Sequence, residues 1–139
     1  MGFQPKVLLV EPNEIEENRA RQAITQSGVA CTVWVARDGV EACNRLFDKS
    51  ESLPDIVLLE LNLPKLDGFE VLRQIRANER TRRIPVIVLT QSGEVADVDR
   101  CFDLYANSYV QKDKDLEIFE TRLRLLLYYW IAVNKNVSA

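Results

Sequence analysis

Five short runs of apolar residues recur along the chain at nearly even intervals, and this repeat constrains the fold more than any other feature. The runs start near residues 6, 30, 56, 85 and 108, and segments with apolar residues at helical spacing separate them. Intervals of this length accommodate one strand, one helix and the return to a parallel neighbouring strand. The sequence therefore predicts an α/β fold in which a doubly wound, five-stranded parallel sheet carries helices on both faces.

The third apolar run predicts a buried strand over Ile56–Leu61 that ends beside a carboxylate. Its apolar residues are continuous rather than alternating, which is typical of a strand covered on both faces. Pro64 and the Asp67-Gly68 pair then predict a turn before the next helix. Because ligands and chemistry in open parallel sheets lie at the carboxyl ends of the strands, Glu60 stands where function is expected.

Polar side chains also close three of the other strands. Glu11 follows the first strand, Thr90 ends the fourth, and Lys112 follows the fifth. Any one of them is compatible with a chance polar residue at the end of a strand. Together with Glu60 they form a set suited to phosphate, because an acid pair holds a divalent cation while a lysine and a hydroxyl bind phosphoryl oxygens.

The composition excludes several classes of protein. The chain contains no histidine, which rules out a His-metal site, a Ser-His or Cys-His nucleophile and a phosphohistidine carrier. We expect no catalytic residues and no enzyme activity. The net charge of −3 gives no reason to expect nucleic acid as a partner, and no apolar run approaches the ~18 residues of a membrane span.

The cysteines and the N-terminus indicate the compartment. Cys31, Cys43 and Cys101 are odd in number and form no C-x-x-C motif, so we expect buried, reduced thiols. The first residues contain neither a signal-peptide core nor a myristoylation motif. These features predict a cytoplasmic protein that does not bind a membrane.

Five segments, in order and spacing, resemble the receiver domain of response regulators in two-component signalling. The segments are Leu9–Asn13, Ala36–Gly39, Pro54–Gly68, Ile84–Thr90 and Ala106–Lys112. The resemblance covers nearly the whole chain and implies the flavodoxin-like (βα)5 fold of receivers. The long turn over Asn62–Gly68 and the aromatic last helix are similar to the cyanobacterial phytochrome response regulators in particular.

The resemblance implies a role for each residue at the strand ends. Glu60 occupies the phosphoacceptor position, which is normally aspartate, and Glu11 and Pro12 occupy the acidic pair that holds Mg²⁺. Asn62 would offer its backbone carbonyl to the metal together with Glu11 and Glu60. The phosphoryl-binding and switch positions fall on Thr90 (hydroxyl), Tyr109 (aromatic) and Lys112 (amine).

Two departures from the family pattern fall on the residues that do the chemistry. Pro12 has no side-chain oxygen, and Glu60 extends its carboxylate about 1.5 Å further than aspartate. A misplacement near 1 Å can cost on the order of 10²-fold in a positioned reaction. The usual site charge of −2 also falls to −1 when Glu11, Glu60 and Lys112 are summed. We therefore predict Mg²⁺ binding that is weak or lost, no other cofactor, and phosphorylation that is lost or very poor.

Several hypotheses remain open from the sequence. Glu60 either reaches Lys112 and Thr90 and imitates a phosphoryl group, or pairs with Lys112 and freezes the switch. A second hypothesis keeps Mg²⁺-dependent phosphorylation by a partner histidine kinase. A third, a flavodoxin-like cofactor protein, lacks the expected Gly-rich phosphate loop after Val10.

Helical spacing predicts which helix faces are buried. In the first helix the inward residues are expected to be Ile15, Ala20, Ala23 and Ile24. In the last helix, expected over about 115–134, one stripe predicts the core: Leu116, Phe119, Leu123, Leu126 and Trp130. A second stripe is made by Ile118, Leu125 and Tyr129, to which Leu127, Tyr128 and Ile131 add.

The second stripe predicts a protein contact. A helix packed on a sheet needs only one apolar stripe, and aromatic enrichment favours an interface over deeper burial. We expect a single receiver domain over 1–139 without an output domain. Its partners would be a sensor histidine kinase or another signalling protein. The resemblance implies a homodimer through the fourth helix, fifth strand and fifth helix, with Leu125, Tyr128, Tyr129 and Ile131 at the interface.

Overall fold

Five parallel strands form one sheet in the order β2-β1-β3-β4-β5 in the computed structural model, which describes residues 4–135. The expected domain limits at residues 1 and 139 lie outside the described residues. The strands are β1 (Lys6–Val10), β2 (Thr32–Ala36), β3 (Ile56–Leu59), β4 (Val86–Thr90) and β5 (Ser108–Gln111). Val10 lies opposite both Ala36 and Leu59, so the first three strands end at one level.

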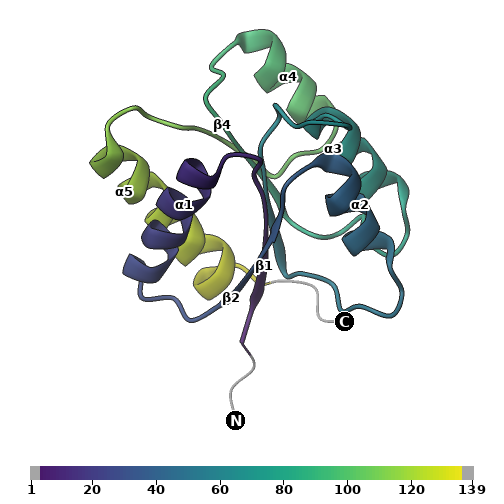
Figure 1. Cartoon of the computed structure of the whole chain (residues 1–139), viewed down its shortest axis with the longest axis horizontal. Coiled ribbons are helices and arrows are strands. Elements are labelled where there is room, and N and C mark those ends of the chain that lie inside the picture. Colours follow the sequence, from purple (N-terminus) through teal and green to yellow (C-terminus); the bar gives the residue numbers. More distant parts are fainter. Residues whose placement is uncertain (1–3, 136–139) are drawn as a thin grey trace.

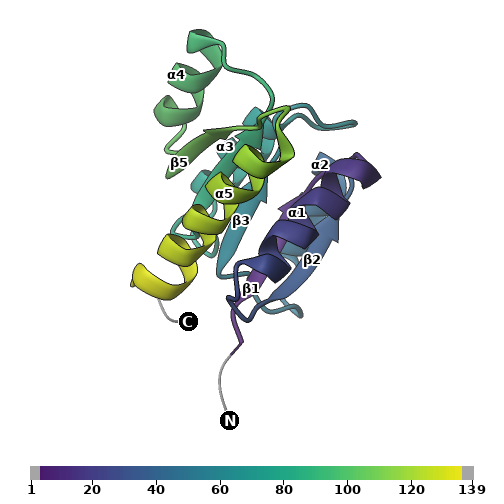
Figure 2. The same cartoon turned by 90° about the vertical axis from the view of Figure 1, so that its left-hand side faces the viewer.

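Helices cover both faces of the sheet, as the sequence predicted. They are α1 (Glu14–Gln26), α2 (Gly39–Phe47), α3 (Gly68–Ala77), α4 (Val95–Asp103) and α5 (Leu116–Leu127), which continues as the π-helix η1 (Tyr128–Val133). Figure 1 shows α1 and α5 on one face and α2, α3 and α4 on the other. Figure 2 shows α1 and α5 side by side. No helix within residues 4–135 has the length and apolar character needed to cross a membrane.

The core consists of two apolar clusters, one on each face of the sheet. Val57 and Leu59 of β3 belong to the cluster under α2 and α3, whereas Ile56 and Leu58 belong to the cluster under α1 and α5. All four side chains are fully buried. Successive side chains of a strand point to opposite faces, so a strand covered on both sides must be apolar at every position.

Short polar side chains cap the N-termini of four of the five α-helices, which begin shortly after the strands end. Each accepts a hydrogen bond from a backbone N–H in the first turn, which satisfies a donor that the helix itself leaves free. The capping residues are Asn13, Asp38, Asp67 and Asp115. The exception is α4, whose N-cap residue Glu94 makes no side-chain capping bond.

The third strand ends two residues earlier than predicted, at Leu59 instead of Leu61. The Leu61 N–H bonds the Glu60 carboxylate at 2.8 Å, and the Leu61 carbonyl accepts the N–H of Gly68 at 2.8 Å. Gly68 lies so close that a Cβ there would be 2.5 Å from the carbonyl oxygen of Glu60. The turn before α3 therefore takes Leu61 out of the ladder.

The predicted inward face of α1 was wrong at one position. Ile15 is 69% exposed, whereas Ala20, Ala23 and Ile24 are buried. The first buried side chain of α1 is Glu17, so the first turn of this helix contributes nothing apolar to the core.

In α5 the core face is wider than the predicted stripe. Phe119, Leu123 and Leu126 are buried as predicted, but Leu127 is also fully buried. These positions follow the i, i+4, i+7, i+8 pattern of an amphipathic helix. Leu116, predicted to be core, is 38% exposed. Two residues of η1, Trp130 and Ile131, are half-buried against the same cluster.

Candidate functional site

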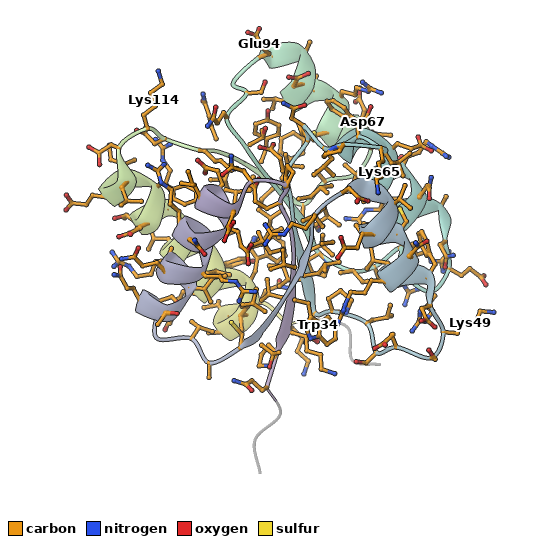
Figure 3. All side chains as sticks on the ribbon, in the orientation of Figure 1. Trp34, Lys49, Lys65, Asp67, Glu94 and Lys114 are labelled. Atoms are coloured by element: carbon orange, nitrogen blue, oxygen red, sulfur yellow. The ribbon has the colours of Figure 1, made fainter. Side chains whose placement is uncertain are left out.

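The polar residues at the strand ends converge on one edge of the sheet, as predicted. The Glu60 N–H bonds the Val10 carbonyl at 3.1 Å, and the Lys112 N–H bonds the Thr90 carbonyl at 2.7 Å. The backbone pairing thus continues one residue beyond the strands. This is the upper edge in Figure 3, where the labelled loop residues Lys65, Asp67, Glu94 and Lys114 lie.

The Lys112 ammonium is surrounded by three carboxylates. Its Nζ lies 2.5 Å from Oε1 of Glu11, 3.3 Å from Oε1 of Glu60 and 3.6 Å from Oε2 of Glu16. The Lys112 and Glu11 side chains are only 4% and 5% exposed. We call these four residues the Lys112 cluster. Sequence reasoning found three of its members.

Glu16 is the member that sequence reasoning missed. It lies in the first turn of α1, where its N–H bonds the Asn13 side chain at 3.0 Å. With Glu16 counted, the cluster carries −2 rather than the predicted −1, which corrects the expectation of a less negative site. Arg19, at 3.7 Å from the other Glu16 oxygen, offsets part of this charge. The capping position three residues before Glu16 was the available clue, because it sets which first-turn side chains face the strand ends.

The remaining carboxylate oxygens of Glu11 and Glu60 also have partners inside the protein. Oε2 of Glu11 accepts the Asn13 N–H at 3.1 Å. Oε2 of Glu60 accepts the Leu61 N–H at 2.8 Å and lies 3.5 Å from the Asn62 nitrogen. The extra methylene of Glu60 lets its carboxylate turn back onto its own loop. Asn62 is exposed and meets the cluster through its N–H.

Burial and charge act together on the titration of the cluster. Burial raises the pKa of Glu11, although the hydrogen bond and charge of Lys112 act in the opposite direction. Burial alone would lower the pKa of Lys112, but Glu11, and then Glu60 and Glu16, raise it above its usual value. Lys112 therefore remains an ammonium at neutral pH.

Among the described residues, neither the Thr90 nor the Tyr109 side chain hydrogen-bonds Glu60. The Thr90 side chain is buried, and within residues 4–135 it makes no hydrogen bond to Glu60. The Tyr109 hydroxyl donates to the carbonyl oxygen of Ser92 at 2.7 Å, and its half-buried ring packs against the α2–α3 core cluster. The structure thus joins Glu60 to Lys112 but not to Thr90.

One usual side-chain ligand for a divalent cation is missing at this edge, and the remaining strand-end carboxylates are already ion-paired. Pro12 supplies no oxygen, and the Lys112 ammonium lies against both strand-end carboxylates. Among the described residues, no group of three or more acidic, cysteine or histidine side chains is arranged to hold a metal ion. Mg²⁺ requires near-octahedral oxygen ligands, so a cation would have to compete with Lys112 for Glu11 and Glu60.

Comparison with known proteins identifies the class to which this fold and edge belong. Residues 7–124 match the family described as response regulator receiver domain. The chain belongs to this family, and it is a receiver domain of two-component signal transduction.

Two curated relatives extend over most of the chain. It is 38% identical over 133 residues to the probable methanogenesis regulatory protein FilR2 of Methanothrix harundinacea, covering 94% of this chain and 86% of that protein. It is 34% identical over 132 residues to the response regulator Rcp1 of Synechocystis sp., covering 91% of this chain and 90% of that protein.

Solved structures confirm the flavodoxin-like receiver fold and the similarity to phytochrome response regulators. The phosphorylated cyanobacterial phytochrome response regulator RcpA superposes with a TM-score of 0.91 at 34% identity, covering 98% of this chain and 100% of that one. The Mn²⁺-bound form of Rcp1 also superposes with a TM-score of 0.91, at 30% identity, covering 96% and 99%. A divalent metal is thus present at least in one relative.

Proposed function

We propose that this receiver domain is a binding module of two-component signalling that no longer accepts a phosphoryl group. The observation that supports the proposal is the closed set of ion pairs around Lys112. The amine that would bind phosphoryl oxygens is already bound by Glu11 and Glu60. The second oxygen of Glu60 accepts the Leu61 N–H, so both oxygens of this carboxylate already have hydrogen-bond partners inside the protein.

Of the two roles left open for Glu60, the geometry supports the inert ion pair. Imitation of a phosphoryl group requires contacts to both Lys112 and Thr90. Glu60 contacts Lys112 at 3.3 Å, but its other oxygen bonds the backbone of its own loop. The switch is therefore held in one state, and the surface it presents does not depend on an incoming phosphate.

The same geometry supports weak Mg²⁺ binding at most. Two carboxylates remain from the usual acidic set, and both are ion-paired with the same buried ammonium. Rcp1 has been crystallised with Mn²⁺, which makes the comparison of the two proteins a direct measure of the loss. We expect no saturable binding of this chain at Mg²⁺ concentrations that saturate Rcp1.

The test restores the two altered residues. Wild type, Pro12→Asp, Glu60→Asp and the double variant are incubated with acetyl phosphate and Mg²⁺, and intact mass is measured. We expect one phosphoryl group per chain in the double variant alone, and none without Mg²⁺. A stoichiometric adduct on the wild type would contradict the proposal and support the alternative, Mg²⁺-dependent phosphorylation by a partner histidine kinase.

Output by contact requires an exposed surface, and α5 with its continuation offers one. Leu125, Tyr128 and Tyr129 are 64%, 59% and 48% exposed. Of the four predicted interface residues, only Ile131 lies half-buried against the core. We propose a homodimer through α4, β5 and α5, to which Phe102 of α4, 48% exposed, would add.

The remaining partners and the location follow from the same proposal. A sensor histidine kinase or another signalling protein is the proposed partner, and the net charge of −3 supports the exclusion of nucleic acid. A cytoplasmic location is supported by the three free cysteines, two of which are buried. We propose that residues 1–139 form one receiver domain that acts without catalysis of its own.

A further inference from the structure

The loop between β4 and α4, residues 91–94, is bonded by two side chains of β5. Nε2 of Gln111 donates to the carbonyl oxygen of Gln91 at 3.1 Å, and the Tyr109 hydroxyl donates to the carbonyl oxygen of Ser92 at 2.7 Å. Side chains two apart on a strand point to the same face. Two successive carbonyls of the loop are therefore bonded from one side by one strand.

The amide of Gln111 also fills the space above Gly93. A Cβ at position 93 would lie 2.7 Å from Oε1 and 2.8 Å from Nε2 of Gln111. Any larger residue would have to displace this amide, and with it the hydrogen bond to Gln91. Gly93 and Gln111 are thus in close contact, and the contact involves no charged group.

The start of α4 depends on the position of this loop. Glu94 provides no side-chain cap, and the Ser92 hydroxyl instead accepts the Glu94 N–H at 3.3 Å and donates to Asp97 at 2.5 Å. Within α4 only Cys101 is buried. Figure 2 shows α4 standing apart from α1 and α5, and Figure 3 labels Glu94 at its start.

Gln111 occupies a position that joins this loop to the rest of the edge. It lies opposite Thr90 in the sheet and directly precedes Lys112. Its backbone carbonyl accepts Nη1 of Arg122 from α5 at 3.1 Å. One residue therefore contacts the loop through its side chain, α5 through its carbonyl and the Lys112 cluster through its neighbour in the chain.

We propose that Gln111 is a positioning residue that, with Gly93, clamps the β4–α4 loop and thereby fixes the exposed face of α4. The clamp acts from β5 and needs no occupant at the strand ends. It goes beyond the proposed function, because it holds whether or not Glu60 accepts a phosphoryl group. A result on the clamp is thus separable from the phosphorylation test.

The test measures amide hydrogen exchange by NMR at Asp97 and Val98, whose N–H groups bond the Glu94 carbonyl in the first turn of α4. Gln111→Ala removes the clamp, and Gln111→Glu keeps the shape without the N–H donor. We expect exchange about 5-fold faster at both amides in both variants, the factor for one lost hydrogen bond. The urea midpoint of global unfolding should stay at the wild-type value, which separates positioning from a general loss of stability.

A double-mutant cycle with Gly93→Ala supplies the matched comparison. We expect Gly93→Ala to accelerate the same amides by displacing the Gln111 amide, and to add nothing in the Gln111→Ala background. Gln22→Ala, at an exposed position of α1, should leave Asp97 and Val98 unchanged. Exchange within twofold of wild type in Gln111→Ala, or full additivity in the double variant, would overturn the proposal.

Discussion

Glu11 and Glu17 are both buried carboxylates near the start of α1, yet their surroundings shift their pKa values in opposite directions. Burial raises the pKa of Glu11. The pKa of Glu17 is lowered, first by the hydrogen bond from Nε of Arg21 at 2.8 Å and then by the charge of Arg37. Glu17 has two guanidinium partners, whereas Glu11 shares one ammonium with two other acids. This contrast gives a test of the Lys112 cluster that needs no ligand.

The free energy of unfolding should depend on pH with opposite signs at these two positions. A raised pKa means that the folded state binds the Glu11 proton more tightly than the unfolded state, so this contribution to stability falls as the pH rises above about 4.5. Relative to Glu11→Gln, wild type should therefore lose stability as the pH rises from about 4.5 through the higher, folded-state pKa of Glu11. Urea unfolding at several pH values measures the difference.

Glu17→Gln is the matched control for this prediction. Because the pKa of Glu17 is lowered, its contribution is present above about pH 4.5 and is lost as the pH falls through the lower, folded-state value. Wild type should therefore gain stability over Glu17→Gln as the pH rises. Differences that run parallel for the two variants would mean that Lys112 compensates Glu11 fully.

Positions at strand ends were predictable from the sequence, but the directions of their side chains were not. The parallel sheet alone brings Glu11, Glu60 and Lys112 to one edge, so their meeting followed from the strand pattern. Glu16 was missed because its approach to Lys112 depends on the rotational phase of α1. The Tyr109 hydroxyl is directed by the carbonyl of Ser92, a contact with a loop that no periodic pattern describes.

At the scale of elements, α3 is tied to the opposite end of β4 by one side chain. Arg76 donates to the carbonyl oxygens of Tyr105 at 2.9 Å and Ile84 at 2.8 Å, and to the side-chain oxygen of Asn107 at 2.7 Å. Asn107 in turn accepts the N–H of Val86, the first residue of β4. The segments before β4 and before β5 therefore share one cation.

Removal of this guanidinium should destabilise the domain measurably. Arg76→Met keeps the length of the side chain but leaves several acceptors without a charged donor, which costs about 2 kcal/mol. Arg73→Met on the same helix is the matched control, because Arg73 is exposed and, within residues 4–135, forms an ion pair with Glu70 alone. It should cost less than about 0.5 kcal/mol. Equal losses in urea unfolding would show that Arg76 acts through helix propensity or charge alone.

Element types followed from the sequence more securely than element ends. The five strands and five helices were predicted because apolar periodicity reflects burial on the sheet. The end of β3 was misplaced because Gly68 packs against Glu60, a contact set by the turn rather than by the strand. Leu127 was placed in the second stripe of α5, for which a protein contact was favoured over deeper burial, because one stripe was assumed to be the whole core face.

At the scale of the whole molecule, the polar strand ends and the exposed apolar surface lie on different elements. The Lys112 cluster closes the carboxyl ends of the strands, whereas the exposed apolar residues of α5 and η1 lie along one side of the molecule. Arg122 bonds the carbonyl of Gln111, which turns the adjoining face of α5 towards β5. Ile118, four residues before Arg122 on the helix, and Leu125, three residues after it, share that face and remain 42% and 64% exposed.

A homodimer through this face would bury those residues, and a single charge should disrupt it. Leu125→Glu places a carboxylate at the centre of the predicted interface, where a residue of this kind contributes about 2 kcal/mol, so the dissociation constant should rise about 30-fold. Sedimentation equilibrium measures the change.

Ile15→Glu is the control, because Ile15 is equally exposed but lies in the first turn of α1, away from α5's outer face. Association with a micromolar dissociation constant corresponds to about 8 kcal/mol of binding free energy. If the wild type is still monomeric at about 100 μM, a concentration about a hundred times higher, then α5 is not a self-association surface. The exposed leucine and tyrosines would then serve a different protein, since burial against the core is already complete at Leu123 and Leu127.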